Sequence, residues 1–340
     1  MAGIRDYGYV VGTLPTGPRN LISDVAGVRV GHATVDEGRS HTGVTVILPT
    51  EGNVMRKRPV AASYVLNGFG KTIGTVQLDE LGCLETPIAL TNTLCASRVA
   101  DALITRALAE NLTAMSVNPL VGETNDYRIN DIRTRVITER HVEEAFANAC
   151  EDFAQGAVGA GRATVCFGLK GGIGSASRVV HACGQTYTLG VLVQSNFGVM
   201  EQLRVCGQPV GQRISKELHD VACAHQAEQG SVMVVVATDA PLTSRQVRRV
   251  IKRAGAGLAR TGSCLGNGSG DVFLGFSTGN LIPARSRKPI MLTCLPDDTL
   301  DQLFVACIEA TEEAVLSSLV NAEPDVGLDG TIYHSLSEFL

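Results

Sequence analysis

The sequence predicts an α/β fold in which β-sheets are layered between helices. Short segments rich in β-branched residues, bounded by Gly, Pro, Asn or Asp, are mixed with longer segments that space their apolar residues as a helix does. The chain shows neither a regular strand–helix–strand alternation nor an internal repeat. Because no low-complexity linker divides it, we expect one domain.

Five segments are expected to form strands, and one of them is distinctive. They are residues 28–30 with their flanks, 42–48, 187–194, 231–238 and 272–277. Residues 232–237 form a near-continuous apolar run, which is typical of a strand covered on both faces. We therefore expect 231–238 to be buried from both sides.

Four segments are expected to form helices. They span residues 91–110, 139–155, 243–260 and 298–319. Asn111, Gly156 and Gly262 follow the first three of them and mark their ends. Thr243 or Ser244 is the expected N-cap of the third helix, since a hydroxyl there can accept from a free backbone N–H.

The composition bears on the partners of the protein. Charged residues make up only 19% of the chain and hydrophobic residues 44%, which indicates a large core and apolar surface covered by other subunits. The net charge of −5 argues against nucleic acid or an acidic membrane as partner. The basic run from Arg245 to Arg253 is interpreted as a solvated helix face. No segment has the ~20 apolar residues of a membrane span, and the start lacks a signal-peptide core, so we expect a cytoplasmic protein.

The ten cysteines and seven histidines give no sign of a metal site. There is no CxxC pair, no Cys/His cluster at zinc spacing and no HExxH pattern. Most cysteines have apolar neighbours, so we interpret them as buried free thiols in a reducing compartment. Neither a metal nor a cofactor is expected.

Two glycine-rich segments are candidates for ligand loops. Residues 168–178 fit neither GxGxxG nor GxxxxGK[ST], and we interpret them as a tight turn where backbones approach closely. Residues 266–271, GNGSGD, suit either a plain turn or a polar nest, and spacing alone favours the turn. A Ser-His-Asp triad has no GxSxG segment to support it.

The Gly230–Ser231 pair, at the start of the buried strand, suggests a chemistry that needs no histidine. Such a pair is usually only a turn. If its peptide bond breaks, however, Ser231 gains an α-amine with an ordinary pKa of about 7.7–8.0, which suits a general base near neutrality. That amine can activate the serine hydroxyl. A hydrolase built in this way would lack every His-based or metal-based signature.

Ordered blocks along nearly the whole chain resemble one family. The blocks are residues 20–32, 41–49, 67–70, 79–93, 121–126, 169–178, 193–198, 230–242 and 259–278. In them the sequence resembles the L-aminopeptidase/D-amidase-esterases and β-peptidyl aminopeptidases, known as the DmpA or P1 peptidase family. The resemblance implies a four-layer α/β/β/α sandwich similar to that of ornithine acetyltransferases, with residues 1–340 as a single domain.

The resemblance also implies that an inactive precursor cleaves itself before a serine that opens a central strand. Here that serine is Ser231, so cleavage after Gly230 would give an α chain of residues 1–230 and a β chain of residues 231–340. Tetramers of such αβ units are usual in the family. The expected activity is release of N-terminal residues from small peptides, amino-acid amides or esters.

Further catalytic residues are carried over from the family's motifs. The second serine and its acidic partner map onto Ser269 and Asp271, which could orient the new amine of the nucleophile. The oxyanion-hole asparagine maps onto Asn196, whose amide N–H can meet a developing negative charge. A tyrosine of similar role falls on Tyr127. Glu123 is a candidate anchor for the substrate ammonium, with a purely structural carboxylate as the alternative.

Two other functions remain open from the sequence. An acyltransferase of the same fold would use the same nucleophile but pass the acyl group to an amine. A family member that folds without cleaving itself would serve as a binding protein.

Overall fold

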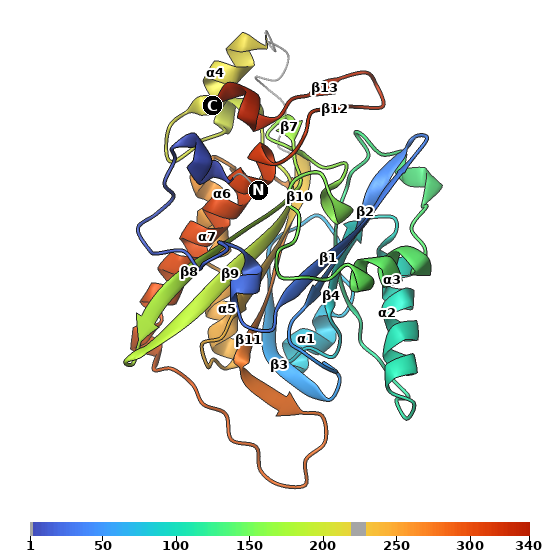
Figure 1. The fold of residues 1–340 in the computed structure, drawn as a ribbon, viewed down its shortest axis with the longest axis vertical. Coiled ribbons are helices and arrows are strands. Elements are labelled where there is room, and N and C mark those ends of the chain that lie inside the picture. The colour runs from blue at the N-terminus through green and yellow to red at the C-terminus, as the bar shows by residue number, and fades with distance from the viewer. Residues whose placement is uncertain (1–2, 219–228) are drawn as a thin grey trace.

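Two β-sheets packed face to face between two layers of helices make up the molecule (Figure 1). The computed structural model describes residues 3–218 and 229–340, except for the side chain of Gln229. Within the described residues, no helix is both long enough and apolar enough to cross a membrane.

The four-stranded sheet has the strand order β1-β2-β4-β5. Its strands are β1 (Arg29–Glu37), β2 (Ser40–Leu48), β4 (Ile88–Asn92) and β5 (Leu120–Thr124). β4 and β5 run parallel, and the other neighbours are antiparallel. Two helices, α2 (Ala96–Glu110) and α3 (Glu139–Ala147), cover its outer face, where Val44 and Val46 share a core with Val99 and Leu103.

The five-stranded sheet has the order β3-β11-β10-β9-β8. Its strands are β3 (Lys57–Gly68), β8 (Ile173–Ala182), β9 (Gln185–Asn196), β10 (Gln229–Thr238) and β11 (Gly268–Pro283). β10 runs parallel to β11 and antiparallel to β9. The helices α5 (Ser244–Ile251), α6 (Ala254–Arg260) and α7 (Asp301–Val320) cover its outer face.

Besides short 3₁₀ helices, the described residues form several smaller elements outside the two sheets and their helix layers. These are the helices α1 (Thr75–Leu81) and α4 (Val210–Glu217), the strand pair β6 (Val165–Cys166) with β7 (Leu169–Lys170), and the strand pair β12 (Asp325–Val326) with β13 (Ile332–Tyr333).

The central strand β10 confirms the four-layer prediction. Val232, Val234 and Val236 pack in the core beneath the helices. Met233 and Val235 pack in the separate core between the two sheets. Alternate side chains of one strand therefore enter two different cores, which explains the unbroken apolar run.

The predicted helices exist, but three of their boundaries or spans were wrong. Thr91 belongs to β4, and the first helix begins only at Ala96, after Asn92 Oδ1 accepts the N–H of Cys95 (3.1 Å). The second ends at Ala147, because the chain turns to pair Cys150 with β1. The third divides into α5 and α6, and Thr243 is its N-cap as predicted.

Two predictions about loops had different outcomes. Backbones do approach closely at residues 168–172, since a Cβ on Gly172 would lie 2.3 Å from the carbonyl oxygen of Gly156, but the predicted turn ends there because β8 begins at Ile173. The GNGSGD segment is not a plain turn, because β11 already begins at Gly268. Pairing with β10 on one side and β3 on the other overrides the local preference of its glycines.

The cysteines are less buried than predicted. Cys83, Cys95, Cys166 and Cys307 are buried and Cys206 is half-buried, but Cys150, Cys183, Cys264 and Cys294 are exposed, and Cys223 lies outside the described residues. Cys183 shows why the prediction fails, since it occupies the tight turn between β8 and β9 with a φ of 49°. Apolar neighbours along the chain do not bury a turn residue.

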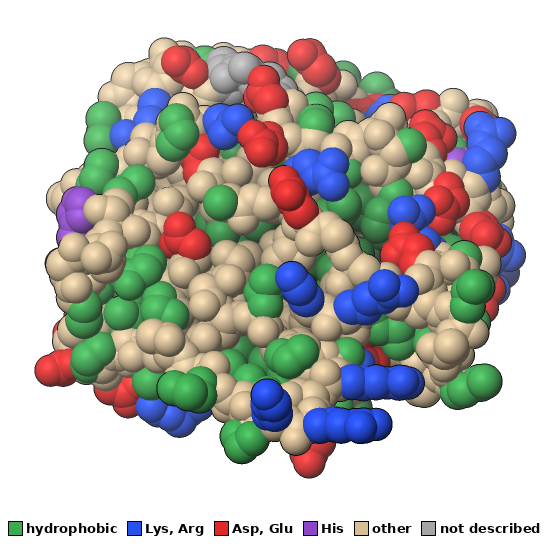
Figure 2. Space-filling view, turned by 60° about the horizontal axis from the view of Figure 1, so that its bottom comes forward, with side chains coloured by type: hydrophobic (Ala, Val, Ile, Leu, Met, Phe, Trp, Pro, Cys, Tyr) green, Lys and Arg blue, Asp and Glu red, His purple; other side chains and the backbone are tan. Residues whose placement is uncertain are grey.

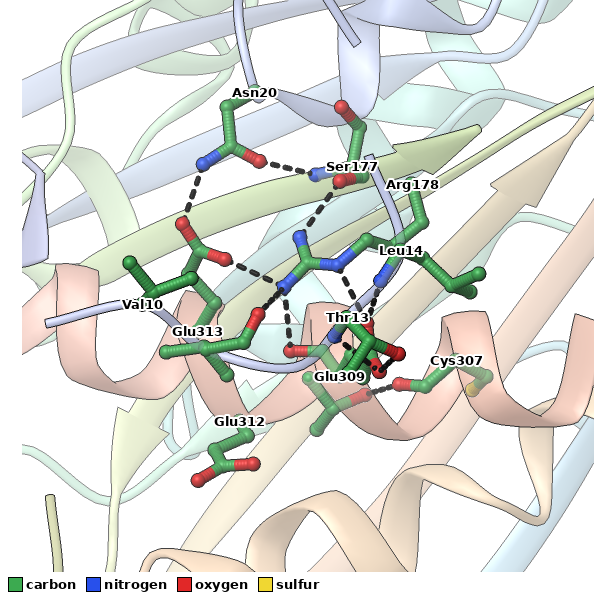
Figure 3. A network of polar contacts seen from close by, with 12 residues as sticks. Val10, Thr13, Leu14, Asn20, Ser177, Arg178, Cys307, Glu309, Glu312 and Glu313 are labelled. Atoms are coloured by element: carbon green, nitrogen blue, oxygen red, sulfur yellow. Dashed lines mark hydrogen bonds and ion pairs between the residues drawn. The ribbon is translucent and has the colours of Figure 1, made fainter. Parts of the chain in front are cut away.

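A buried ion-pair network ties the N-terminal segment and β8 to α7 (Figure 3). The fully buried Arg178 donates from Nε to Glu309 (3.1 Å) and from Nη2 to Glu313 (2.6 Å). Glu313 also accepts from Arg5 Nε (2.6 Å), and Glu309 accepts the backbone N–H of Thr13 (2.8 Å). Burial alone raises the pKa of Glu313, but the hydrogen bonds and charges of the two arginines bring it below its ordinary value.

Candidate active site

Ser231 lies at the start of the central strand, on the face between the two sheets. Its side chain follows the same alternation as Met233 and Val235, which pack in the inter-sheet core. Asn125, directly after β5 in the opposite sheet, donates its backbone N–H to Ser231 Oγ (3.3 Å). The hydroxyl thus lies where the start of β10 in one sheet meets the end of β5 in the other.

A cavity of about 570 Å³ opens over this hydroxyl. Both sheets and the loops that follow their strands line it. The residues are Gly68, Phe69, Gly70, Lys71, Thr93, Glu123, Asn125, Tyr127, Arg128, Val165, Asn196, Gly230, Ser231 and Gly268. Its volume lies in the range of pockets that hold small molecules. Among the predicted site residues, Ser231, Gly230, Asn196, Glu123 and Tyr127 therefore share one cavity.

Asn196 is fixed beside Ser231 by its backbone and its side chain. It is the last residue of β9 and pairs directly with Ser231 in the antiparallel register. Its Oδ1 accepts the N–H of Val165 (3.0 Å), and its Nδ2 donates to the carbonyl oxygen of Asn125 (3.0 Å). The amide nitrogen carries two hydrogens, and the bond to Asn125 uses one of them. The carboxamide is thus held rigidly at the wall of the cavity.

Ser269 and Asp271 form a hydrogen-bonded pair on the neighbouring strand. Ser269 Oγ donates to Asp271 Oδ1 (2.6 Å), and both residues are fully buried. The parallel register sets Ser269 beside Gly230, at the usual strand spacing of about 4.8 Å. Neither residue is among those that line the cavity, and alternation places both on the face of Phe273, beneath the helices. The pair therefore lies next to the backbone of the Gly230–Ser231 bond rather than in the cavity.

The strands around this bond are packed too closely for larger residues. A Cβ on Gly230 would lie 2.2 Å from the carbonyl oxygen of Asn196, and one on Gly270 would lie 2.6 Å from that of Phe69. Asn67 stabilises the start of β11 by donating from Nδ2 to the carbonyl oxygen of Ser269 (2.5 Å). Glycine at these two positions therefore allows neighbouring backbone segments to lie close together.

Glu123 and Tyr127 line the cavity in different ways. Glu123 is buried, and its Oε1 accepts the backbone N–H of Lys71 (2.8 Å), with Lys71 Nζ at 3.8 Å. Tyr127 is half exposed, with the guanidinium of Arg128 5.8 Å from the centre of its ring. No role for Lys71, Arg128 or Asn125 was predicted from the sequence. Asn125 lies in the same block of family resemblance as Glu123, residues 121–126, and this position was the one available signal.

Buried charges support the loops behind the cavity. Lys170 Nζ donates to the carbonyl oxygens of Gly171 (2.8 Å) and Thr164 (3.0 Å), next to the Val165 that holds Asn196. Burial lowers the pKa of Lys170 to about 7. Burial raises the pKa of Asp126 to about 6, against the effect of its hydrogen bonds from Asn130 and Thr42. Both groups anchor segments that carry cavity residues.

Among the described residues, no group of three or more His, Cys, Asp and Glu side chains is placed to hold a metal ion. Among the chemical groups that line the cavity are a hydroxyl, a side-chain amide, a backbone N–H and a carboxylate. These are the groups needed to attack a carbonyl, stabilise an oxyanion and hold a cation.

Comparison with known proteins places this site in a family. The sequence profile of peptidase family S58 matches residues 20–333. The β-peptidyl aminopeptidase BapA of Sphingosinicella microcystinivorans is 38% identical over 347 residues, which cover 96% of this chain and 87% of that protein.

Solved structures agree with the sequence match. The PH0078 protein from Pyrococcus horikoshii OT3 superposes with a TM-score of 0.92 at 45% identity, covering 98% of this chain and 96% of that one. The L-aminopeptidase D-Ala-esterase/amidase from Ochrobactrum anthropi, described as a variant of the Ntn hydrolase fold, gives a TM-score of 0.92 at 32% identity, with coverages of 99% and 96%. The chain therefore belongs to peptidase family S58 and is a peptide-bond hydrolase of the aminopeptidase type.

Proposed function

We propose that this chain cleaves its own Gly230–Ser231 bond and then acts as an aminopeptidase with Ser231 as nucleophile. The observation that carries the proposal is the position of Ser231 Oγ. It lies in the cavity, within reach of the Asn125 N–H and next to the fixed carboxamide of Asn196. Preorganised N–H donors beside a nucleophile suit the stabilisation of a tetrahedral oxyanion.

The proposed self-cleavage proceeds through an ester. Ser231 Oγ attacks the carbonyl carbon of Gly230 and loses its proton, while the C–N bond breaks and the nitrogen takes up a proton. Water then hydrolyses the ester, leaving a carboxylate on Gly230 and both a free hydroxyl and a free α-amine on Ser231. Residues 1–230 and 231–340 remain together as one folded unit.

In the mature enzyme the α-amine is the proposed general base. It takes the proton of Ser231 Oγ as the hydroxyl attacks the substrate carbonyl, and later gives that proton to the leaving amine. Water then hydrolyses the acyl-enzyme. Ser269 and Asp271 are proposed to orient the amine, supported by their hydrogen bond beside the backbone of Gly230. Tyr127, which also lines the cavity, is proposed to assist the oxyanion.

The proposed substrates are short peptides, amino-acid amides or esters with a free N-terminus. By their names, the relatives reported above act on β-peptides, on L-amino-acid substrates and on D-alanine esters or amides. These names support a substrate whose acyl group, the part transferred to Ser231, is small. Glu123 is the proposed anchor of the substrate ammonium. It is a buried carboxylate at the cavity wall, and the side chain of its neighbour Lys71, whose ammonium donates to Thr93 Oγ1, is 55% exposed.

Replacing Glu123 with Gln is expected to weaken the binding of substrates with a free amine. A hydrogen bond to a charged group contributes about 1.5–3 kcal/mol, so KM should rise about 10- to 100-fold while kcat changes less. The measurement is the rate of p-nitroaniline release from alanine p-nitroanilide over a range of concentrations. The exposed Glu37→Gln serves as control. An unchanged KM in Glu123→Gln would contradict the anchoring role.

We also propose that the protein is a cytoplasmic homo-oligomer, a tetramer of αβ units. Large apolar side chains stay in contact with solvent in the single chain, among them Val76, Leu112 and Met115, each at least 86% exposed. Interfaces between αβ units would cover side chains of this kind. Light scattering should give a mass near four times 35.8 kDa, and a monomer at micromolar concentration would contradict the assembly. Cell fractionation should recover the protein with the cytoplasmic contents.

A further inference from the structure

A second cavity, of about 510 Å³, lies at the opposite end of the four-stranded sheet from Ser231. Its lining includes Pro87, just before β4, whereas Asn125 follows the far end of the parallel strand β5. The last turns of α2 and the loop between β2 and β3 enclose it. Figure 2 brings this lower end of Figure 1 forward and shows several Lys and Arg side chains gathered on it. The two cavities share no lining residue.

The wall of this second cavity combines apolar side chains with guanidinium groups. Leu48, Leu103 and Phe146 come from β2, α2 and α3. Arg29 pairs with Leu48 in the β1–β2 register, so both side chains lie on the helix-covered face of the sheet. Arg56 reaches the cavity from the loop between β2 and β3.

The carboxylates that line the cavity already have partners. Glu85 Oε1 pairs with Arg58 Nη1 (2.9 Å), and Glu85 Oε2 accepts from Asn118 Nδ2 (2.8 Å). Glu110 pairs with Arg106 (3.1 Å), whose guanidinium also lies 4.1 Å from the centre of the Phe146 ring.

Two of the arginines differ from these satisfied pairs. Within residues 3–218 and 229–340, neither Arg29 nor Arg56 has a carboxylate at ion-pair distance. Arg29 Nε is enclosed and has no hydrogen-bond partner among these described residues. Arg29 as a whole is only partly buried and lines the cavity, so an anion that enters the cavity can balance the charge of its guanidinium. The cavity thus has two positive charges that its own residues do not balance.

From these observations we propose that the second cavity binds a small organic carboxylate with an apolar body. The planar guanidinium of Arg29 matches the two oxygens of a carboxylate, and Arg56 adds a second positive charge. Leu48, Leu103 and Phe146 pack against the apolar body, which distinguishes the site from one for a bare inorganic anion. This site is independent of the chemistry proposed at Ser231.

Calorimetric titration with 3-phenylpropionate tests the proposal on the full chain. We expect saturable binding, weakened at least tenfold by Arg29→Gln and by Arg56→Gln but unchanged by Arg287→Gln, an exposed arginine outside the cavity. Arg56 is exposed and lies in a loop, so we expect Arg56→Gln to fold. This variant therefore tests the site even if Arg29→Gln fails to fold.

Two matched probes separate the parts of the proposed ligand. The neutral 3-phenylpropanamide should bind at least tenfold more weakly than the acid, because it lacks the charge. Inorganic phosphate should also bind more weakly, because it lacks the apolar body. The proposal is overturned if the acid does not bind, if both arginine variants bind it as the unchanged protein does, or if phosphate binds equally tightly.

Discussion

Replacing Ser231 with Ala is expected to leave the chain uncut and to lower aminopeptidase activity by about 10³-fold or more. The substitution removes the hydroxyl that attacks, and without cleavage the α-amine that serves as base never forms. Alanine fits the buried strand, and the loss within the fold is a single hydrogen bond from Asn125 (3.3 Å). Denaturing electrophoresis measures the cleavage, and p-nitroaniline release measures the activity.

The matched control for this variant is Ser277→Ala. Ser277 is also a buried serine of the five-stranded sheet, but its Oγ donates to the carbonyl oxygen of Ala240 (2.5 Å), away from the cavity. We expect this control to be cut and active. Normal cleavage or normal activity in Ser231→Ala would show that another residue is the nucleophile.

Replacing Arg178 with Met is expected to destabilise the protein by about 3–5 kcal/mol. The change leaves Glu309 and Glu313 buried in α7 without the guanidinium that contacts both (3.1 and 2.6 Å). Urea unfolding of the variant and the unchanged protein measures the difference. Arg213→Met is the control, because its contacts, an ion pair with Glu217 (3.6 Å) and a hydrogen bond to the carbonyl oxygen of Phe339 (2.6 Å), are solvent-exposed and should contribute about 1 kcal/mol or less.

The same network has a consequence for pH and for the cleaved form. Because the pKa of Glu313 lies below its ordinary value of 4.5, its contribution to stability is present above pH 4.5 and is lost as the pH falls through the lowered pKa. The network also joins Arg178 and Arg5 to α7, across the proposed cleavage position. Equal stability of Arg178→Met and the unchanged protein at pH 7 would contradict this anchoring role.

The strand that carries Ser231 could be predicted because its apolar run is short and rich in valine, which is typical of a strand covered on both faces. In the structure, the side chains of residues 232–237 enter two cores in alternation. β4 could not be predicted in the same way. Its last residues, Thr91 and Asn92, are polar and come just before an Ala-rich helix, so in the sequence they look like the first residues of that helix. Pairing with β2 and β5, which local sequence does not show, decides their conformation.

The site was only partly accessible to sequence reasoning. Gly268 and Ser269 have the composition of a turn, yet they pair as a strand with β10. The cavity itself brings together segments far apart in the chain, so Lys71 and Arg128 gave no local signal. Arg29 likewise looks like an ordinary strand residue until the helix layer encloses its Nε.

The most direct test of the account is the intact mass of the purified, denatured protein after incubation. We predict two chains, with the masses of residues 1–230 and 231–340, because the Ser231 hydroxyl has attacked the Gly230 carbonyl. A single chain of 35.8 kDa that persists on incubation would contradict self-cleavage and the nucleophile that depends on it.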